Sequence, residues 1–450
     1  MSVQRGSNHS PMLPSRAAVV VVGGGPAGFM AAISAAESGL ADVLVLEATG
    51  EFLHKVRISG GGRCNVTHAC WDPRALVGHY PRGGQALRGP FSRFATSDTV
   101  AWFAARGLQL VEEADGRLFP RSNSSASVVE ALRRAAVSAG VRLLPAAAVR
   151  AVGLPDEAAG FQLTLRSGQR LQAERLVLAT GSHPSGFQIA ASLGHSVVAP
   201  VPSLFSLSLA GDSAASLTDL AGLAIDPVAL ELLPSASAGA APGRRRSGAP
   251  RHRQRGPVLI THWGLSGPAI LRLTAFAARD LRDWGYRGRL RVDWTGGLGL
   301  EQLEARFEAA RRDHPRRSLA AWRPWPSLSR RLWSHLLVRA GLPEAEAAEL
   351  RWADLSRSRR RDLLSALSDA HYPISGRGPF GEEFVTAGGV PLGEVNLATL
   401  ESRRCPGLHL VGELLDVDGV TGGFNFQHCW SSGWLAGQAL AESSRNAERR

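Results

Sequence analysis

The sequence predicts an α/β fold built on a parallel sheet, with further segments of different character inserted into the chain. Residues 17–22 form an apolar strand, residues 26–38 have a helical pattern, and residues 43–47 form a second apolar strand. A strand, a helix and a strand in this order make a βαβ unit, in which the two strands run parallel. Pro26 suits the first position of the helix and Gly39 suits its end.

In the rest of the chain, the spacing of apolar residues changes several times. Residues 149–181 alternate in short segments, which predicts a small antiparallel meander that returns to the main sheet. Later segments are strand-like, then helical, and then strand-like again up to a final helix near Phe426. We therefore predict five parts: a disordered tail (1–16), a first α/β segment (17–199), a β-rich inserted domain (200–298), a helical subdomain (299–371) and a second α/β segment (372–450).

Composition indicates a folded protein with reduced thiols. The chain has 450 residues, of which 44% are hydrophobic, and this is ample for two or three domains. Residues 1–16 are polar and no later run has the length of a membrane span, so we expect a cytoplasmic protein without a membrane partner. The four cysteines have no zinc-like spacing, and we expect neither a metal site nor disulfides.

The chain is strongly basic, with a net charge of +12. Arginine-rich faces favour polyanionic partners, because binding releases the counterions of the phosphates. Solvated loops and helix faces would give the same composition, so both interpretations stay open. Much of the excess charge lies in four runs: 243–256, 311–317, 357–362 and 448–450.

A glycine motif follows the first strand. Gly23, Gly25 and Gly28 form GxGxxG, which gives a tight turn, a close approach of the backbone to a pyrophosphate, and close packing of helix on strand. Glu47 ends the second strand, where its carboxylate can accept a hydrogen bond from a ribose hydroxyl. The N-terminus of the helix adds amide donors for the phosphates. The motif in this context predicts a bound adenine dinucleotide.

A second glycine-rich stretch, KVRISGGGRCN, runs from Lys55 to Asn65. Its glycines, Gly60, Gly61 and Gly62, open the backbone to something that must approach closely. Lys55 is the only lysine of the chain, which suggests a position where a compact ammonium works and a guanidinium does not. A lysine that has persisted by chance is the alternative.

A third stretch, residues 408–433, favours FAD over NAD. It is predicted to form a strand that ends before Gly412, an acidic turn, a double glycine and a helix. This order places Asp416 or Asp418 near a ribityl chain, and it directs the amides after Gly423 at the pyrimidine edge of a flavin. Weaker candidates for cofactor contacts are Val149, Ala179, Thr180 and Gly181.

The motifs GGGPAG, KVRISGGGRCNVT, GRLFPRS, THWGLSGPAIL and GELLDVDGVTGGFNFQ, spread over nearly the whole chain, resemble the BaiN/RdsA family of FAD-dependent oxidoreductases. The resemblance implies noncovalent FAD in a two-segment Rossmann domain of the glutathione-reductase type, with a β-barrel-like domain and a helical domain between the segments. His68, Ser182 and the pair His428-Cys429 depart from the family pattern. By the resemblance, the residues that flank the isoalloxazine are Gly60, Gly61, Gly62, Arg63, Cys64 and Asn65 on one side and Gly422, Gly423 and Asn425 on the other.

The family's activities include reduction of an electron-poor C=C bond, in a steroid-like enone or in a uridine of large-subunit ribosomal RNA, and oxidation of a small amine. Reduction needs hydride at the β-carbon and a proton donor near the α-carbon or carbonyl oxygen. Candidate donors are Cys64, His262, His428 and Lys55, and Arg63 is the candidate anchor for a carbonyl or an anion.

The basic composition favours the ribosomal RNA uridine. The alternatives are an oxidase of a small amine or amino-ketone that returns electrons to oxygen, and a flavin-stabilised RNA-binding factor without turnover. No second GxGxxG follows a strand, so we expect NAD(P)H to dock only transiently, or a partner protein to deliver the electrons.

Overall fold

A computed structural model describes residues 13–155, 160–210, 217–234, 252–379 and 385–448. The chain forms two compact units. The first unit comprises Met1–Pro200 and Thr386–Arg450, and the second comprises Val201–Val385. Most of the predicted tail and of the first arginine run lies outside the described residues. The sheet already includes Arg16, which the prediction had placed in the tail.

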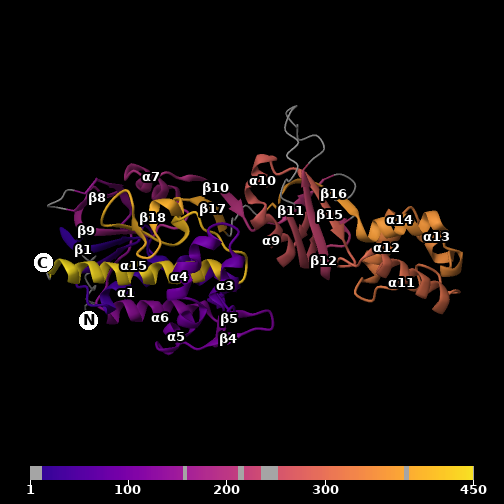
Figure 1. The fold of residues 1–450 in the computed structure, drawn as a ribbon, viewed down its shortest axis with the longest axis horizontal. Helices are drawn as coiled ribbons and strands as arrows, with labels where there is room; N and C mark the ends of the chain where they lie inside the picture. The colour runs from indigo at the N-terminus through magenta and orange to yellow at the C-terminus, as the bar shows by residue number, and fades with distance from the viewer. Residues whose placement is uncertain (1–12, 156–159, 211–216, 235–251, 380–384, 449–450) are drawn as a thin grey trace, which may run out of the picture. The chain divides into compact units, whose positions relative to one another are not determined.

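The first unit is built on the predicted parallel sheet (Figure 1). Strand β1 (Arg16–Val22) lies between β2 (Val43–Leu46) and β9 (Arg170–Leu178), and both neighbours run parallel to it. From β9 the sheet continues to β20 (Leu408–Leu410), again parallel, so the two chain segments share one sheet. The remaining strands of this sheet are β6 (Arg142–Leu144), β7 (Val149–Val152), β8 (Phe161–Leu165), β18 (Val395–Asn396) and β19 (Glu401–Ser402).

The predicted meander is present. Strands β7 and β8 pair antiparallel, β8 pairs antiparallel with β9, and β9 is the strand that enters the main sheet. A separate small sheet contains β3 (Thr67–His68), β5 (Arg117–Pro120) and β4 (Leu110–Glu112). The main helices of the first segment are α2 (His54–Gly62), α4 (Arg88–Arg93), α5 (Thr96–Ala104), α6 (Ser125–Ser138) and α7 (Pro184–Ser192).

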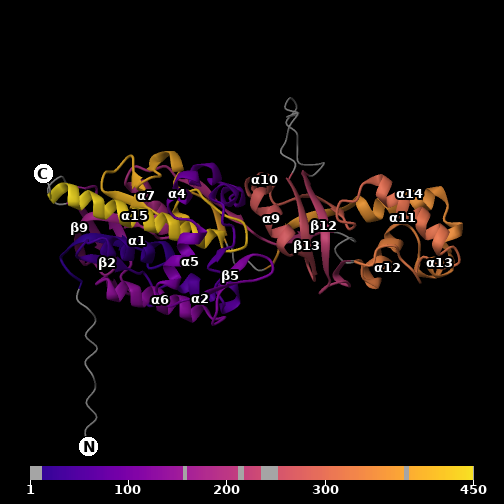
Figure 2. The ribbon, with the colours of Figure 1, turned by 60° about the horizontal axis from the view of Figure 1, so that its bottom comes forward.

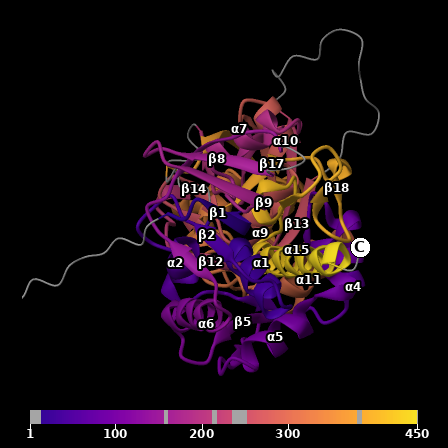
Figure 3. The same cartoon turned by 90° about the vertical axis from the view of Figure 1, so that its left-hand side faces the viewer.

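Two helices from opposite ends of the chain hold the segments of this unit together. Helix α1 (Pro26–Glu37) lies beside α15 (Phe424–Glu448), as Figure 3 shows. The contact is close because α15 presents glycines to α1: a Cβ at Gly433 would lie 2.5 Å from the carbonyl oxygen of Ala27. The hydroxyl of Ser34 donates to the carbonyl of Trp434 at 3.1 Å.

The second unit contains a closed barrel, in agreement with the β-barrel-like domain that was expected. Two helices, α9 (Pro268–Phe276) and α10 (Ala278–Asp283), lie within the segment predicted as β-rich, and the prediction missed them. The strands, in order around the barrel, are β11 (Leu207–Leu209), β14 (Gly264–Ser266), β13 (His252–Thr261), β12 (Ala224–Pro234), β15 (Gly288–Asp293) and β16 (Ala370–Arg377).

The expected helical part follows β15 and is visible in Figure 2. Its apolar side chains form one continuous core with the barrel: Phe307, Trp333 and Trp352 belong to the same cluster as Leu230 and Val258. Barrel and helices are therefore one unit. The predicted boundary at residue 372 falls inside β16, because that strand closes the barrel. The helices are α11 (Leu300–Asp313), α12 (Arg330–Arg339), α13 (Glu344–Glu349) and α14 (Arg357–Ser368).

The chain passes between the units through β10 (Val198–Ser203) and β17 (Val385–Gly389), which form a two-stranded sheet. Among the helices that the structure describes, none combines the length and apolar character needed to span a membrane.

Candidate functional site

Four predicted segments meet at one edge of the sheet in the first unit. Gly23 follows β1, Glu47 follows β2, Ala179 to Gly181 follow β9, and Gly412 follows β20. These strands are adjacent and parallel, so their carboxyl ends lie at the same edge. In open α/β sheets this edge is where nucleotide ligands bind.

The glycine turn after β1 is closely packed on one side and open on the other. Gly23 has φ +115°, and a Cβ there would lie 2.3 Å from the carbonyl oxygen of Ala179. A Cβ at Gly28 would lie 2.0 Å from the carbonyl oxygen of Gly23, which explains how α1 packs on the strand. Around Gly25, just before the start of α1, no atom lies within 4 Å of a Cβ position. The backbone therefore faces open space where a pyrophosphate would approach the helix N-terminus.

The Glu47 carboxylate lies beside this turn. Its oxygens accept hydrogen bonds from the amide of Gly24 at 2.9 Å and from the amide of Thr49 at 2.8 Å. The amide of Ala147 donates to the Glu47 carbonyl at 2.7 Å, so the chain that leads into β7 and Val149 also reaches the end of β2. The arrangement suits a carboxylate that accepts from a ribose hydroxyl, with Val149 nearby.

The triple glycine breaks α2. Gly60, Gly61 and Gly62 have φ values of +57°, +67° and +84°, and Cys64 also lies in the left-handed region at +59°. Residues that have a side chain rarely adopt this backbone conformation, so the run of glycines allows the loop to form. No atom lies within 4 Å of a Cβ position at Gly61 or Gly62.

The double glycine of the second segment reaches the same region through β3. A Cβ at Gly423 would lie 2.7 Å from the backbone of Thr67, so only glycine permits this approach. The Thr67 hydroxyl donates to the side-chain oxygen of Gln427 at 2.6 Å, and the Trp430 indole donates to the carbonyl of Val66 at 2.9 Å. The loop that contains Gly60 to Asn65 is thereby connected to the start of α15.

The side chain of Asn425 stabilises the loop that contains Gly422 and Gly423. Its side-chain oxygen accepts from the amide of Gly419 at 2.8 Å, and its side-chain nitrogen donates to the carbonyl of Gly419 at 2.9 Å. Asp418 forms a buried ion pair with Arg82 through both of its carboxylate oxygens, and its side chain is 0% exposed. Asp416 is half-buried in the same turn, and its amide donates to the carbonyl of Val390 at 2.9 Å. Asp418 therefore has a structural partner in this turn.

Lys55 pairs with a residue that the sequence analysis missed. Its ammonium lies 2.6 Å from a carboxylate oxygen of Glu413, and both groups lie beside Gly181. Burial alone would lower the pKa of Lys55, but the charge and hydrogen bond of Glu413 outweigh it and raise that pKa. The Lys55 side chain therefore stays protonated and provides a fixed positive charge. The signal for Glu413 was its place directly after a buried strand and a glycine.

Arg63 and Cys64 have surroundings of different kinds. The Arg63 guanidinium donates to Asn123 at 2.5 Å, pairs with Glu113, and lies 4.0 Å over the ring of Phe119. Cys64 is fully buried, and burial raises the pKa of its thiol to about 12. A thiol in these surroundings is a weak acid, which favours a packing role.

The two candidate histidines lie in different units. His428 is buried in α15, where burial lowers its pKa to about 4, and its Nε2 lies 3.2 Å from the carbonyl oxygen of Gly412. His262 is exposed in the turn between β13 and β14 of the second unit.

Two buried polar atoms support a large polar ligand at this edge. The side-chain oxygen of Asn65 and the hydroxyl of Thr180 are inaccessible to solvent and have no hydrogen-bond partner within the described residues. Buried polar groups are rarely left unpaired, so such atoms point to a ligand or an ordered water. With the open glycine backbone, they fit the cofactor that the sequence predicts, FAD. The described residues contain no cluster that could hold a metal ion.

The fold and this edge define a dinucleotide-binding protein of the Rossmann type. A family model described as "HI0933-like protein Rossmann domain" matches residues 17–439, and the chain belongs to this family. The resemblance to the BaiN/RdsA oxidoreductases and the Rossmann-type fold class are thereby confirmed.

Relatives align over nearly their whole length. The 3-dehydro-bile acid delta(4,6)-reductase of Clostridium scindens is 33% identical, with 94% of this chain and 98% of the relative covered. The ribosomal RNA dihydrouridine synthase of Escherichia coli is 28% identical, with 94% and 97% covered. Among solved structures, the 3-ketosteroid delta1-dehydrogenase of Sterolibacterium denitrificans has a TM-score of 0.49 at 14% identity, with 96% and 100% covered.

Proposed function

We propose that this protein is an FAD-dependent reductase of electron-poor C=C bonds, and that its substrate is a uridine of large-subunit ribosomal RNA. The observation that carries the proposal is the meeting of glycine loops from both chain segments at one sheet edge, next to buried polar atoms without partners among the described residues. The names of two relatives describe the saturation of a C=C bond, in a bile acid and in uridine. The net charge of +12 favours the RNA.

The balanced reaction converts uridine, NAD(P)H and one proton into dihydrouridine and NAD(P)⁺. FAD, when bound, supplies the two-electron chemistry that passes hydride from the nicotinamide to the uracil. The chain's own residues bind and orient. Glu47 accepts from the ribose, the amides at Gly25 and the start of α1 bind the phosphates, and the amides after Gly423 donate to the pyrimidine edge.

Charged residues at this edge have distinct proposed roles. The Lys55 ammonium, fixed by Glu413, provides a positive charge near the phosphates or ribityl chain. Asp416 contacts the ribityl chain. Arg63 keeps donors that Asn123 and Glu113 do not use, and it anchors a carbonyl oxygen of the substrate.

The test is the dihydrouridine content of ribosomal RNA from a strain that lacks the gene. Mass spectrometry of the nucleosides is expected to show a loss that the wild-type gene restores and a Gly23→Val variant does not. Unchanged dihydrouridine in the deletion strain would exclude the RNA substrate.

Reduction of a steroid enone is a second candidate, because the bile acid reductase is 33% identical. It predicts that the purified yellow protein oxidises NAD(P)H when a 3-keto-4-ene bile acid is added, without any RNA. Release of hydrogen peroxide with a small amine would instead support the amine oxidase. RNA binding without any redox turnover would support the RNA-binding factor.

A further inference from the structure

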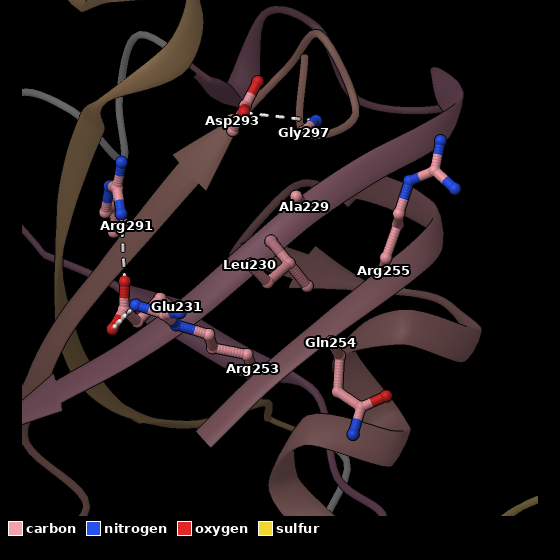
Figure 4. Close-up of a pocket in the computed structure, with 9 residues that line it drawn as sticks. All are labelled: Ala229, Leu230, Glu231, Arg253, Gln254, Arg255, Arg291, Asp293 and Gly297. Carbon is pink, nitrogen blue, oxygen red and sulfur yellow. Dashed lines mark hydrogen bonds and ion pairs between the residues drawn. The ribbon is translucent and has the colours of Figure 1, made fainter. Parts of the chain in front are cut away.

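The outer face of the barrel in the second unit has a hollow of about 420 Å³ lined by three arginines (Figure 4). Ala229 of β12 is paired with Arg255 of β13 on one side and with Asp293 of β15 on the other. Residues paired across neighbouring strands lie on the same face of a sheet. The side chain of Ala229 is much shorter than those of Arg255 and Asp293, so its methyl group forms the floor of the hollow between them.

The next outward-facing row along the same strands is a charged triplet. Glu231 is paired with Arg253 and with Arg291, and its two carboxylate oxygens accept from them at 3.0 Å each. Arg291 also donates to Asp369 at 2.6 Å. Although burial alone would raise the pKa of Glu231, the hydrogen bonds from both arginines lower it, so Glu231 remains ionised. The Glu231 carboxylate fixes the two guanidiniums and Asp369 compensates the second positive charge, so this row offers oriented donors rather than excess charge.

The first row contains one positive group, Arg255, and one negative group, Asp293, on either side of Ala229. The Asp293 carboxylate accepts from the amides of Thr295 at 2.8 Å and Gly297 at 3.1 Å, so its oxygens are occupied by the turn. Arg255 is exposed, and its Nε donates to the carbonyl of Gly296 at 2.7 Å. Within the described part of the chain, its two terminal nitrogens have no hydrogen bond or ion pair. The guanidinium is thus oriented through Nε and keeps donors for a ligand.

These features select an anionic ligand with several oxygens. Guanidiniums fixed by neighbouring acceptors form paired hydrogen bonds to phosphate, because their planar donors match its oxygens. Arg253 and Arg291 are 56% and 40% exposed, so a single small anion would be bound weakly in competition with water and salt. A polyanion gains from many such interactions at once, and the net charge of +12 complements one.

We propose that this hollow binds a phosphodiester group of the RNA substrate, with Arg255 as its principal donor. The proposal rests on the proposed RNA substrate and adds to it a binding surface on the barrel. Arg255 positions the RNA and does not take part in the chemistry.

Binding of the full-length flavoprotein to a fluorescent transcript of bacterial large-subunit ribosomal RNA, measured by anisotropy over a series of salt concentrations, tests the proposal. The slope of log affinity against log salt falls by about 0.7 to 0.9 for each phosphate that the protein no longer neutralises. Arg255→Gln is expected to reduce the slope by this amount. Arg134→Gln on α6 is the matched control, because it removes the same charge from an exposed side chain and is expected to leave the slope unchanged.

A second pair of variants tests the hollow without changing the charge. Ala229→Phe is expected to fill the floor and weaken RNA binding severalfold at low salt. Leu233→Phe adds volume on the same strand outside the lining and is expected to bind normally. Flavin absorbance and the circular dichroism spectrum confirm that each variant is folded.

An unchanged slope in Arg255→Gln, or normal RNA binding by Ala229→Phe, would overturn the inference. These outcomes are separate from failure of the proposed function. If the deletion strain keeps its dihydrouridine but Arg255→Gln lowers the slope, the surface binds RNA and only the substrate assignment fails. If dihydrouridine disappears and the slope is unchanged, the function stands and the barrel surface does not.

Discussion

The cofactor edge of the first unit and the arginine-lined hollow of the second are built in opposite ways. The cofactor edge depends on residues without side chains, since a Cβ at Gly23, Gly28 or Gly423 would meet backbone atoms at 2.7 Å or less. The hollow depends on long side chains around a short one, on a regular sheet surface. We therefore expect a side chain at any of these three glycines to disrupt the first site, whereas substitutions around the hollow should change its affinity in small, separate steps.

The largest expected effect comes from a buried charge next to the cofactor edge. Asp418→Asn removes the carboxylate charge that pairs with the Arg82 guanidinium, which is only 10% exposed, and it should lower the free energy of unfolding by about 3 to 5 kcal/mol. Glu231 is itself buried, but its two arginine partners are 56% and 40% exposed and water can solvate them, so we expect Glu231→Gln to cause a smaller decrease of about 1 to 2 kcal/mol. Urea unfolding of both variants checks the contrast. Equal decreases would show that the two regions do not differ in tolerance.

Gly23→Ala is expected to have the next largest effect. The added methyl combines a positive φ with an approach of 2.3 Å to a carbonyl oxygen, and together these should cost about 3 kcal/mol and prevent flavin binding. Gly50→Ala is the control, because no atom lies within 4 Å of its Cβ position. Its stability should stay within about 0.5 kcal/mol of the wild type. Normal flavin absorbance in Gly23→Ala would contradict the assignment of this turn to the cofactor.

Acid should destabilise the first unit. His428 and His409 are buried there, and burial lowers the pKa of each to about 4 from an ordinary value of 6.5. Between these pH values the unfolded chain binds a proton that the native histidine does not, so stability falls as the pH decreases from 6.5 to 4. Each histidine contributes about 3 kcal/mol to this decrease.

Hydrogen exchange at several pH values between 7 and 4 measures this pH dependence of stability. Peptides from the first unit are compared with peptides from the second. His428→Asn should make the stability less dependent on pH in this window. An unaltered pH dependence in that variant would show that the pKa of His428 is the same in the native and unfolded states.

The smallest expected effect concerns Lys55. Lys55→Met leaves the Glu413 carboxylate unpaired beside the cofactor edge, and removal of one charge-assisted hydrogen bond should weaken flavin binding about tenfold. Arg57→Gln on the same helix is the control, since its partner is Glu51, and we expect unchanged flavin affinity. Titration of the apoprotein with FAD measures both. A variant that binds flavin normally but no longer reduces the substrate would instead support Lys55 as a proton donor.

Much of the fold could be predicted from the sequence because it depends on local rules. Pro26 and Gly39 marked the ends of α1 to within two residues. The change in the periodicity of apolar residues separated the barrel from the helical part. Two errors came from tertiary context. Helices α9 and α10 are short and lie among strands, and β16 joins the barrel although it follows the helices.

For the site, the glycine motifs alone indicated where the backbone can be approached closely, because glycine adopts positive φ values without strain and leaves room for a close neighbour. The partners of the charged side chains emerged from the three-dimensional arrangement. Lys55 with Glu413, Arg82 with Asp418, and Arg255 beside Ala229 depend on strand register and on the joining of two chain segments in one sheet. Each of these residues can be singled out by its local sequence, but the pairing itself follows from long-range packing.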